Sequence, residues 1–420
     1  MTGIKHLFSP RTFLQSTVYF IGTMLIVSDI QAADHKLDYG VRLRHADLKD
    51  GEVDGQAQSA LIRLNLDSSW TSNLSTFIEL DYVETGSEDE HSDGARFNGQ
   101  PAIPDVPGFD LNQVLVQYDF TNGQIKLGRQ KINLDNQRHV GAMSFWQNEQ
   151  TFDAARVDLN WLSSSQFNYI YIANANRISG DDADENLDPS DINFAQFAGR
   201  RPPPALGDHE HNTHLLRAEF NEWDYSKLNV YSYIVDNKDV PLTSANTVGA
   251  SYAFKYKPTT FQYRVEAEAA IQKRTEAPTE PTLPYYRFDI GVGIKSFEVS
   301  WRYEQLASKN GIPFFSVLGS LHEFQGWGDR LNAPPANGLE DKSFRITWRK
   351  APWKIDARYH RFDEESGSQD LGEEFDMDIT YKFLKKHSFM LRFADYQANE
   401  NTSLGIEDRR RAIFSYSYNL

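Results

Sequence analysis

Beyond residue 34, hydrophobic and polar residues alternate with a period of two. The segments 261–269, 344–349 and 375–383 alternate without interruption. Because successive side chains of a strand point to opposite faces, each segment predicts a β-strand with one apolar and one polar face. Capping signals ahead of helix-period runs are not evident, so the pattern indicates an all-β chain.

The same pattern recurs about 18 times along the chain. The predicted strands are 38–45, 58–68, 75–84, 110–120, 123–131, 152–162, 166–175, 212–221, 226–236, 246–257, 260–273, 285–294, 297–307, 341–350, 353–362, 373–383, 387–397 and 409–420.

Short and long connections alternate between these strands. The short ones include 121–123, 257–259, 295–296, 350–352 and 384–386. The long ones span about 10 to 36 residues and include 85–109, 132–151, 176–211 and 308–340. An even number of strands with short turns on one rim and long loops on the other is typical of an outer-membrane barrel. We therefore expect a transmembrane antiparallel β-barrel of about 18 strands over residues 33–420, with short periplasmic turns and long extracellular loops.

Two further expectations concern the loops. The four long loops are expected to share one rim. Loop 132–151 carries little charge and contains the pair Phe145-Trp146, which favours burial over exposure to water. It is therefore expected to fold inward and narrow the pore.

The two faces of the strands differ in polarity. One face is rich in Phe, Tyr, Trp, Val and Ile, and would contact lipid. The other face carries Arg42, Arg44, Arg63, Glu79, Asp81, Arg156, Asp158, Arg217, Glu219, Arg264, Glu266, Arg287, Asp289, Arg302, Arg345, Arg349 and Arg358. A soluble β-sandwich would place the charged face outside. The C-terminal run, with Phe414, Tyr416, Tyr418 and Leu420 on one face, resembles the terminal strand of outer-membrane proteins and favours the barrel.

The N-terminus predicts export from the cytoplasm. Lys5 and Arg11 precede an apolar run over 13–27, and small residues follow at Ala32 and Ala33. This order is typical of a secretory signal peptide, which we place at residues 1–32. The alternative is a transmembrane anchor, but the run is shorter than the roughly 20 residues that a span requires.

Composition narrows the function classes. The 420 residues carry 43 Lys+Arg against 59 Asp+Glu, a net charge of −16, and this argues against nucleic acid as a partner. The absence of cysteine excludes thiolate metal sites and thiol nucleophiles. An aromatic content of 13% excludes a disordered acidic polymer.

Two motifs carry a family resemblance. The first runs from Gly128-Arg129-Gln130-Lys131 through Asp135-Asn136-Gln137-Arg138-His139 to Phe152-Asp153-Ala154, and the second is Phe324-Gln325-Gly326-Trp327-Gly328-Asp329. With these motifs the chain resembles the alginate-export family of outer-membrane porins. The resemblance implies an 18-stranded barrel that passes an anionic polysaccharide or small solutes through an arginine-rich pore.

Cationic side chains are the candidate pore residues. An arginine fork binds carboxylates bidentately, and a narrow pore focuses the field of such charges. The candidates for binding anions are Arg129, Lys131, Arg138, Arg156, Arg42, Arg44, Arg63, Arg345 and Arg349. The alternative is a structural ladder, in which neighbouring carboxylates neutralise them. Arg129 shares the parity of Leu127, so it would face the lumen only with a bulge near Gly128.

No catalytic residue, metal site or cofactor is expected. Ser300 and Ser316 have no readable base, and His209, His211 and His214 lack the spacing of a helical metal motif. An outer-membrane hydrolase would need a nucleophile–base pair on the barrel wall. An adhesin would need a lumen filled by side chains or a loop, whereas about 18 strands enclose more space than wall side chains fill.

A channel is therefore the expected function. It would pass anionic sugars or a polysaccharide such as alginate or its oligomers, by diffusion or export, or serve as an uptake porin for other small solutes. The expected setting is the outer membrane of a Gram-negative cell, in contact with lipid and lipopolysaccharide, as a monomer.

Overall fold

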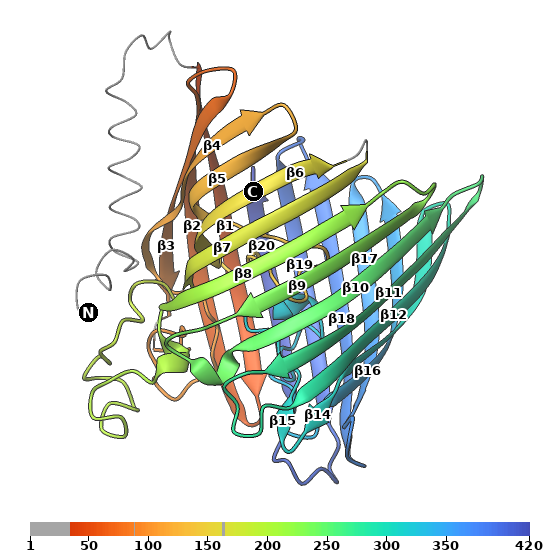
Figure 1. The fold of residues 1–420 in the computed structure, drawn as a ribbon. Coiled ribbons are helices and arrows are strands. Elements are labelled where there is room, and N and C mark those ends of the chain that lie inside the picture. The colour runs from red at the N-terminus through yellow and green to blue at the C-terminus, as the bar shows by residue number, and fades with distance from the viewer. Residues whose placement is uncertain (1–33, 88, 162–163) are drawn as a thin grey trace.

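The computed structural model describes residues 34–87, 89–161 and 164–420. The predicted signal peptide lies outside these ranges. Within them, eighteen strands form one sheet in which every strand is antiparallel to its neighbours (Figure 1). Their bounds are β1 Asp34–Asp50, β2 Val53–Ser69, β3 Leu74–Gly86, β4 Gly108–Phe120, β5 Gly123–Gln130, β6 Thr151–Trp161, β7 Ser165–Asn176, β8 Asp208–Phe220, β9 Ser226–Val235, β10 Ala245–Tyr256, β11 Phe261–Arg274, β12 Thr282–Ile294, β13 Phe297–Leu306, β16 Leu339–Lys350, β17 Trp353–Asp363, β18 Asp370–Phe383, β19 His387–Ala398 and β20 Arg409–Tyr418.

The sheet closes on itself. Strand β1 pairs with β2 on one side and with β20 on the other, so that Arg42 lies opposite both Leu61 and Ser417. A closed sheet leaves no strand edge unpaired, which is the condition for crossing lipid with strands. The predicted 18-stranded barrel is confirmed.

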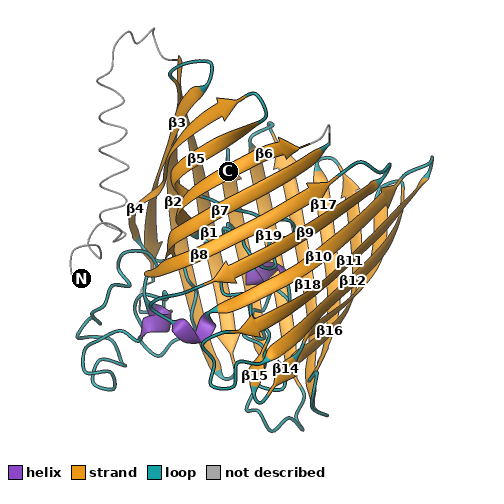
Figure 2. Ribbon diagram, viewed as in Figure 1, coloured by secondary structure: helices purple, strands orange, loops and turns teal. Residues whose placement is uncertain are grey.

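Long loops gather at one rim (Figure 2). The connections 87–107, 131–150, 177–207 and 307–338 follow β3, β5, β7 and β13, and the strict antiparallel order brings all of them to the same end. We call 131–150 inner loop 1 and 307–338 inner loop 2. The predicted common rim is confirmed.

Smaller elements are not part of the barrel wall. Inner loop 2 contains a minimal hairpin of β14 Ser308–Lys309 and β15 Ile312–Pro313. The helical elements of the described residues are short 3₁₀ turns, η1 Pro203–Ala205, η2 Pro241–Thr243 and η3 Leu321–Glu323. None of the described helices has the length and apolar character needed to cross a membrane.

One connection differs from the prediction. Residues 46–57, expected as a long loop, continue β1 and β2 to a two-residue turn at Gly51 and Glu52. Gly51 adopts a φ of +59°, which glycine tolerates without strain. Charged and glycine residues obscure the alternation here, but Leu48 and Ala57 still face inward and pack in a small apolar cluster.

Burial is inverted relative to a soluble protein. Outward residues such as Val248, Ile290 and Phe344 are exposed, Phe344 to 58%, whereas the inward Asp289 and Arg63 are buried, Asp289 to 2% exposure. Lipid would cover the apolar outer face. The largest buried apolar cluster lies inside the barrel, where the inner loops meet the wall.

Candidate solute cavity in the barrel lumen

The two inner loops fold into the lumen and contact each other. The backbone N–H of Gly141 donates to the Leu318 carbonyl at 2.9 Å. The rings of Phe145 and His322 stack with their centroids 3.9 Å apart. The inward fold expected of loop 132–151 is what the structure shows.

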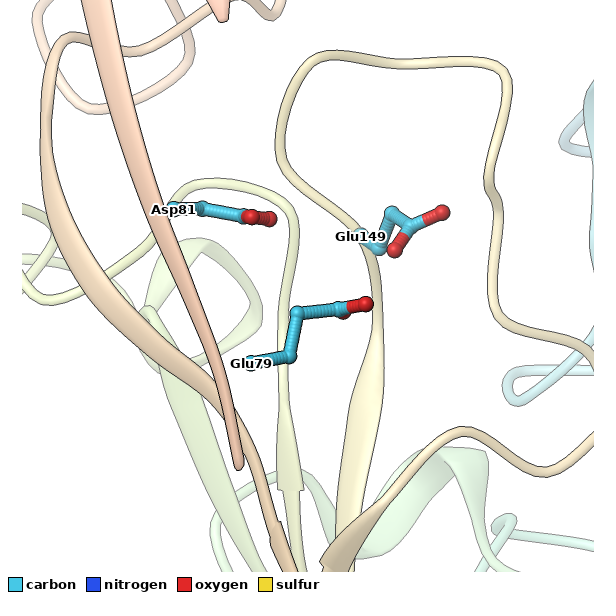
Figure 3. Close-up of side chains that lie close together, drawn as sticks. All are labelled: Glu79, Asp81 and Glu149. Carbon is cyan, nitrogen blue, oxygen red and sulfur yellow. The ribbon is translucent and has the colours of Figure 1, made fainter. Parts of the chain in front are cut away.

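An ion-pair cluster anchors inner loop 1 to the wall. Figure 3 shows Glu79 and Asp81 projecting from β3 toward Glu149, and their carboxylate oxygens lie within 4.8 Å of one another. That is a possible metal-ligand arrangement, but cations of the protein already occupy it. Arg63 reaches Asp81 at 2.6 Å and Glu149 at 2.9 Å, and Lys131 reaches Glu79 at 2.8 Å. Burial alone would raise the pKa of Glu149, but Arg63 and Lys131 outweigh it and lower this pKa to about 2.

Two more arginines of the wall hold the backbone of inner loop 1. Arg42 donates to the Trp146 carbonyl at 2.7 Å. Arg44 donates to the Phe145 carbonyl and pairs with Asp105 at 2.9 Å. Both guanidinium groups thus bind the protein itself, and neither lines the cavity described below.

Backbone N–H groups dock inner loop 2 onto β18. The Trp327 N–H donates to Asp376 at 3.2 Å, and the Gly328 N–H donates to Glu374 Oε1 at 2.6 Å. Gly326 has a φ of +80°, and a Cβ built on it would lie 2.4 Å from the Glu374 carboxyl group. The glycines of the second sequence motif therefore permit the close approach of the loop to these carboxyl groups.

A cavity of about 670 Å³ lies between the inner loops and the wall. Its lining includes the carboxylates Glu323 and Asp329 and the aromatic rings of Phe145, Trp146 and Phe324. Cationic side chains predominate, and they are Arg177, Arg287, Arg302, Arg345, Arg358, Arg409 and Arg411. The cavity is therefore suited to an anion that carries some apolar surface.

The titratable groups at the cavity support this charge assignment. Burial lowers the pKa of His322 below its usual range, despite the adjacent Asp329. Burial would raise the pKa of Asp329, but His322 and Arg411 lower it. Burial would also raise the pKa of Glu323, but Arg392 and Arg358 outweigh it and lower this pKa. Both carboxylates are thus ionised, and the arginines still outnumber them.

Ion pairs with the wall fix most of the cavity arginines in place. Arg302 pairs with Asp289 at 3.0 Å, Arg345 with Asp356 at 2.8 Å, and Arg409 with Asp50 at 2.6 Å. These pairs resemble the structural ladder that the sequence left open as the alternative. The cavity nevertheless presents the guanidinium groups rather than these wall carboxylates.

Of the nine candidate residues from the sequence, Arg345 lines this cavity and the other eight do not. Arg138 is 1% exposed and pairs with Glu304 at 3.1 Å, with its guanidinium 4.8 Å from the Phe324 ring. It therefore joins inner loop 1 to β13 and inner loop 2. Lys131, Arg42, Arg44 and Arg63 hold inner loop 1 in place, as described above.

The remaining candidates lie in the wall. Arg129 pairs with Asp153 at 2.8 Å, and Gly128 has a φ of +123°. Pairing runs without a shift from Leu127 to Arg129 in both ladders of β5, so the bulge that would turn Arg129 inward is not formed. Arg156 pairs with Asp158 two residues further on, at 2.8 Å.

Arg349 lies next to the end of β16, near the short-turn rim. Its nearest acidic partner is Glu298 at 3.6 Å, and its side chain is 51% exposed. It is thus remote from the inner loops, which enter from the other rim.

Several cavity arginines outside the nine candidates could be identified from the alternation of apolar and polar residues along the strands. Arg287, Arg302 and Arg358 lie on the predicted lumen face, and Arg409 and Arg411 lie on the inward parity of β20. Arg177 follows the last residue of β7 in the sequence, and no periodic signal marks it.

A serine–histidine–carboxylate cluster also lies in the lumen. Ser316 Oγ is 2.9 Å from His139 Nδ1, and His139 Nε2 is 3.2 Å from Glu268. Tyr231 donates to the same carboxylate at 2.7 Å. Ser316 is 7% exposed and does not line the cavity. The cluster therefore links both inner loops to β9 and β11 in a buried position, where a substrate would not reach the serine.

The closed barrel with an apolar exterior, a polar lumen and a cavity lined by arginines defines an outer-membrane channel of the porin class. A family model described as alginate export matches residues 51–269, more than half of the chain. The chain therefore belongs to the alginate export family. No curated protein sequence gives a significant match.

Solved structures share the fold. The chain is similar to Acinetobacter baumannii OccAB4, with a TM-score of 0.68 and 10% identity over 93% of this chain and 99% of that one. For A. baumannii OccAB2 the TM-score is 0.68 with 14% identity, over 92% and 97%. For Pseudomonas aeruginosa OccK8 (OprE) the TM-score is 0.65 with 13% identity, over 91% and 98%. At these identities the similarity shows the fold alone.

Proposed function

We propose that this porin passes small anionic solutes by diffusion, and that acidic sugars and short oligomers of the alginate type are its substrate class. The observation that supports the proposal is the cavity between the inner loops, where seven arginines face two carboxylates. A water-filled constriction with such an excess of fixed positive charge concentrates anions and excludes cations.

The packing of the lumen favours short solutes over an intact polymer. The inner loops are joined to each other by backbone hydrogen bonds such as that from Gly141 to Leu318, and to the wall by buried ion pairs such as Arg138–Glu304. A polymer would have to displace these loops along its whole path. A monomeric or dimeric uronate fits a cavity of about 670 Å³ without such a displacement.

Passage of solutes by diffusion requires no catalytic step, metal, cofactor or nucleic acid. Residues 1–32 would be removed as a signal peptide, which the order of the charged, apolar and small residues supports. Residues 33–420 would then act as a monomer surrounded by lipid and lipopolysaccharide.

Reversal potentials in planar bilayers under a KCl gradient test the proposal. The wild-type channel should prefer chloride over potassium, and liposomes that contain it should admit glucuronate faster than glucose. The double variant Arg302→Gln/Arg345→Gln should shift the reversal potential toward cations, because it removes two charges from the cavity.

The matched control is Arg361→Gln/Arg410→Gln. It removes the same number of charges from exposed side chains, which pair with Asp370 and Asp395. This control should leave the reversal potential unchanged. A wild-type channel that prefers potassium, or that admits glucose as fast as glucuronate, would overturn the proposal.

A further inference from the structure

We infer that Arg177 is the residue that binds the carboxylate of the solute directly, at the extracellular end of the cavity. The inference rests on the proposed function and specifies which of the cavity arginines contacts the solute. The remaining cavity arginines set the electrostatic potential.

Arg177 is held by both inner loops through one nitrogen. Its Nη1 donates to Gln150 Oε1 of inner loop 1, and to the Val317 carbonyl of inner loop 2 at 3.0 Å. Nε and Nη2 have no hydrogen-bond partner among the described residues. The guanidinium is thereby fixed in position while one of its edges remains free.

No acidic side chain neutralises this guanidinium. Within the described residues, no carboxylate oxygen lies within 4.0 Å of Arg177, and burial alone lowers its pKa, to about 10. The side chain therefore remains charged at neutral pH. A buried charge without a partner is unfavourable. An incoming anion would therefore form with Arg177 the ion pair that other cavity arginines form with a carboxylate of the protein.

The other cavity arginines have already formed such pairs. Arg302, Arg345 and Arg409 each donate to a wall carboxylate at 3.0 Å or less. Their hydrogen-bonding edges are partly used, although their charge still contributes to the field.

Two arginines outside the cavity show that the lack of an acidic partner does not by itself make an arginine a binding residue for the solute. Arg42 donates to the carbonyls of Ser144 and Trp146, and Arg274 donates to those of Leu242 and Pro313. Neither lines the cavity. Arg177 combines an unpaired charge, a free edge and a position at the cavity surface.

The geometry of the free edge indicates the ligand chemistry. Nε and Nη2 of a guanidinium are parallel donors that match the two oxygens of a carboxylate. Arg177 follows β7 at the long-loop rim, and Ala102 and Pro104 of the extracellular loop 87–107 line the same cavity. A solute entering from outside the cell would therefore meet Arg177 early in its path.

The test is the glucuronate concentration that half-saturates the block of chloride current through single channels. Arg177→Gln should raise this concentration about tenfold or more, because a charge-assisted bidentate bond is lost. Arg177→Lys keeps the charge without the planar fork, and it should give a smaller increase. Arg302→Gln is the control, and it should shift the reversal potential while it changes the half-saturating concentration less than about threefold.

The outcomes separate the two proposals. Suppose that the wild-type channel prefers anions, but glucuronate blocks Arg177→Gln and Arg177→Lys at the same concentration as the wild-type channel. The assignment of Arg177 is then overturned and the proposed function stands. If the wild-type channel has no anion preference, the proposed function fails first. Should Arg177→Gln lose all conductance, Arg177→Lys decides the question. A half-saturating concentration that rises for glucuronate but not for glucose supports direct binding. A half-saturating concentration equal to that of the wild-type channel contradicts it.

Discussion

Gly326 and Gly328 show how single residues position inner loop 2. Both lie against the Glu374 carboxyl group, and the backbone N–H of Gly328 donates to it. A side chain at either position would occupy the volume of that carboxyl group. The contact therefore depends on the absence of a Cβ as well as on the hydrogen bond.

Gly326→Ala should destabilise the docked loop by more than Gly311→Ala does. Both glycines have positive φ, +80° and +74°, so alanine is strained at either position by about 1–3 kcal/mol. A Cβ at Gly326 also overlaps Glu374, whereas nothing lies within 4 Å of a Cβ at Gly311. The comparison is made by limited proteolysis of inner loop 2 in detergent. Equal cleavage rates for the two variants would contradict the docking role of Gly326.

At the scale of elements, buried charged side chains are a main attachment of inner loop 1 to the wall. Inner loop 1 is held by Arg42, Arg44 and the cluster around Glu149. Buried charges depend strongly on their partners, because removal of one leaves the other without compensation. The position of this loop should therefore depend on pH in the range where its carboxylate titrates.

Acidification should loosen inner loop 1. The pKa of Glu149 is lowered from its ordinary value of 4.5 to about 2, so its ionised form stabilises the docked loop fully above pH 4.5 and progressively less as the pH falls toward 2. Single-channel current noise should rise as the pH falls from 4.5 toward 3. Glu149→Gln should show the raised noise already at pH 6, with little further change on acidification. A variant that remains as quiet as the wild-type channel at pH 6 would exclude this role of Glu149.

At the scale of the whole molecule, the charged interior is compatible with a stable barrel because lipid, not water, surrounds the apolar face. The exposed Phe288, Ile290 and Val292 of β12 would be a liability in a soluble protein. In a bilayer their contact with lipid stabilises the barrel. A charged side chain among them destabilises it by an amount that depends on its depth in the bilayer.

Ile290→Arg should cost about 2–4 kcal/mol of unfolding free energy, because the side chain lies well inside the apolar band. Ile294→Arg, on the same face of β12 but at its end next to the short turn, should cost at most about 1 kcal/mol. Urea unfolding of the barrel in phosphatidylcholine vesicles measures both. Similar costs for the two variants would show that β12 does not cross the bilayer as proposed.

The sequence was sufficient for most of the fold. Alternation located all eighteen strands and their lipid face, and the order of short and long connections identified the rims. It was less successful at β1 and β2, because charged residues extend both strands beyond the region where lipid imposes the alternation. It also did not reveal the hairpin β14–β15, which is too short to show a period.

The candidate site could be predicted only in part. Parity assigned the lumen side to Arg287, Arg302 and Arg345, since a residue on a strand has just two directions available. It did not indicate that Arg138 would be buried against Glu304, because that contact depends on the path of a loop through space.

By itself, therefore, the sequence determined a closed barrel with a charged interior, because a period of two and the requirements of the bilayer act locally along every strand. The tertiary structure decided which arginines are neutralised, which hold the inner loops, and which line the cavity. Those roles depend on contacts between segments far apart in the sequence, such as Arg177 with Gln150 and Val317, and periodicity carries no information about such contacts.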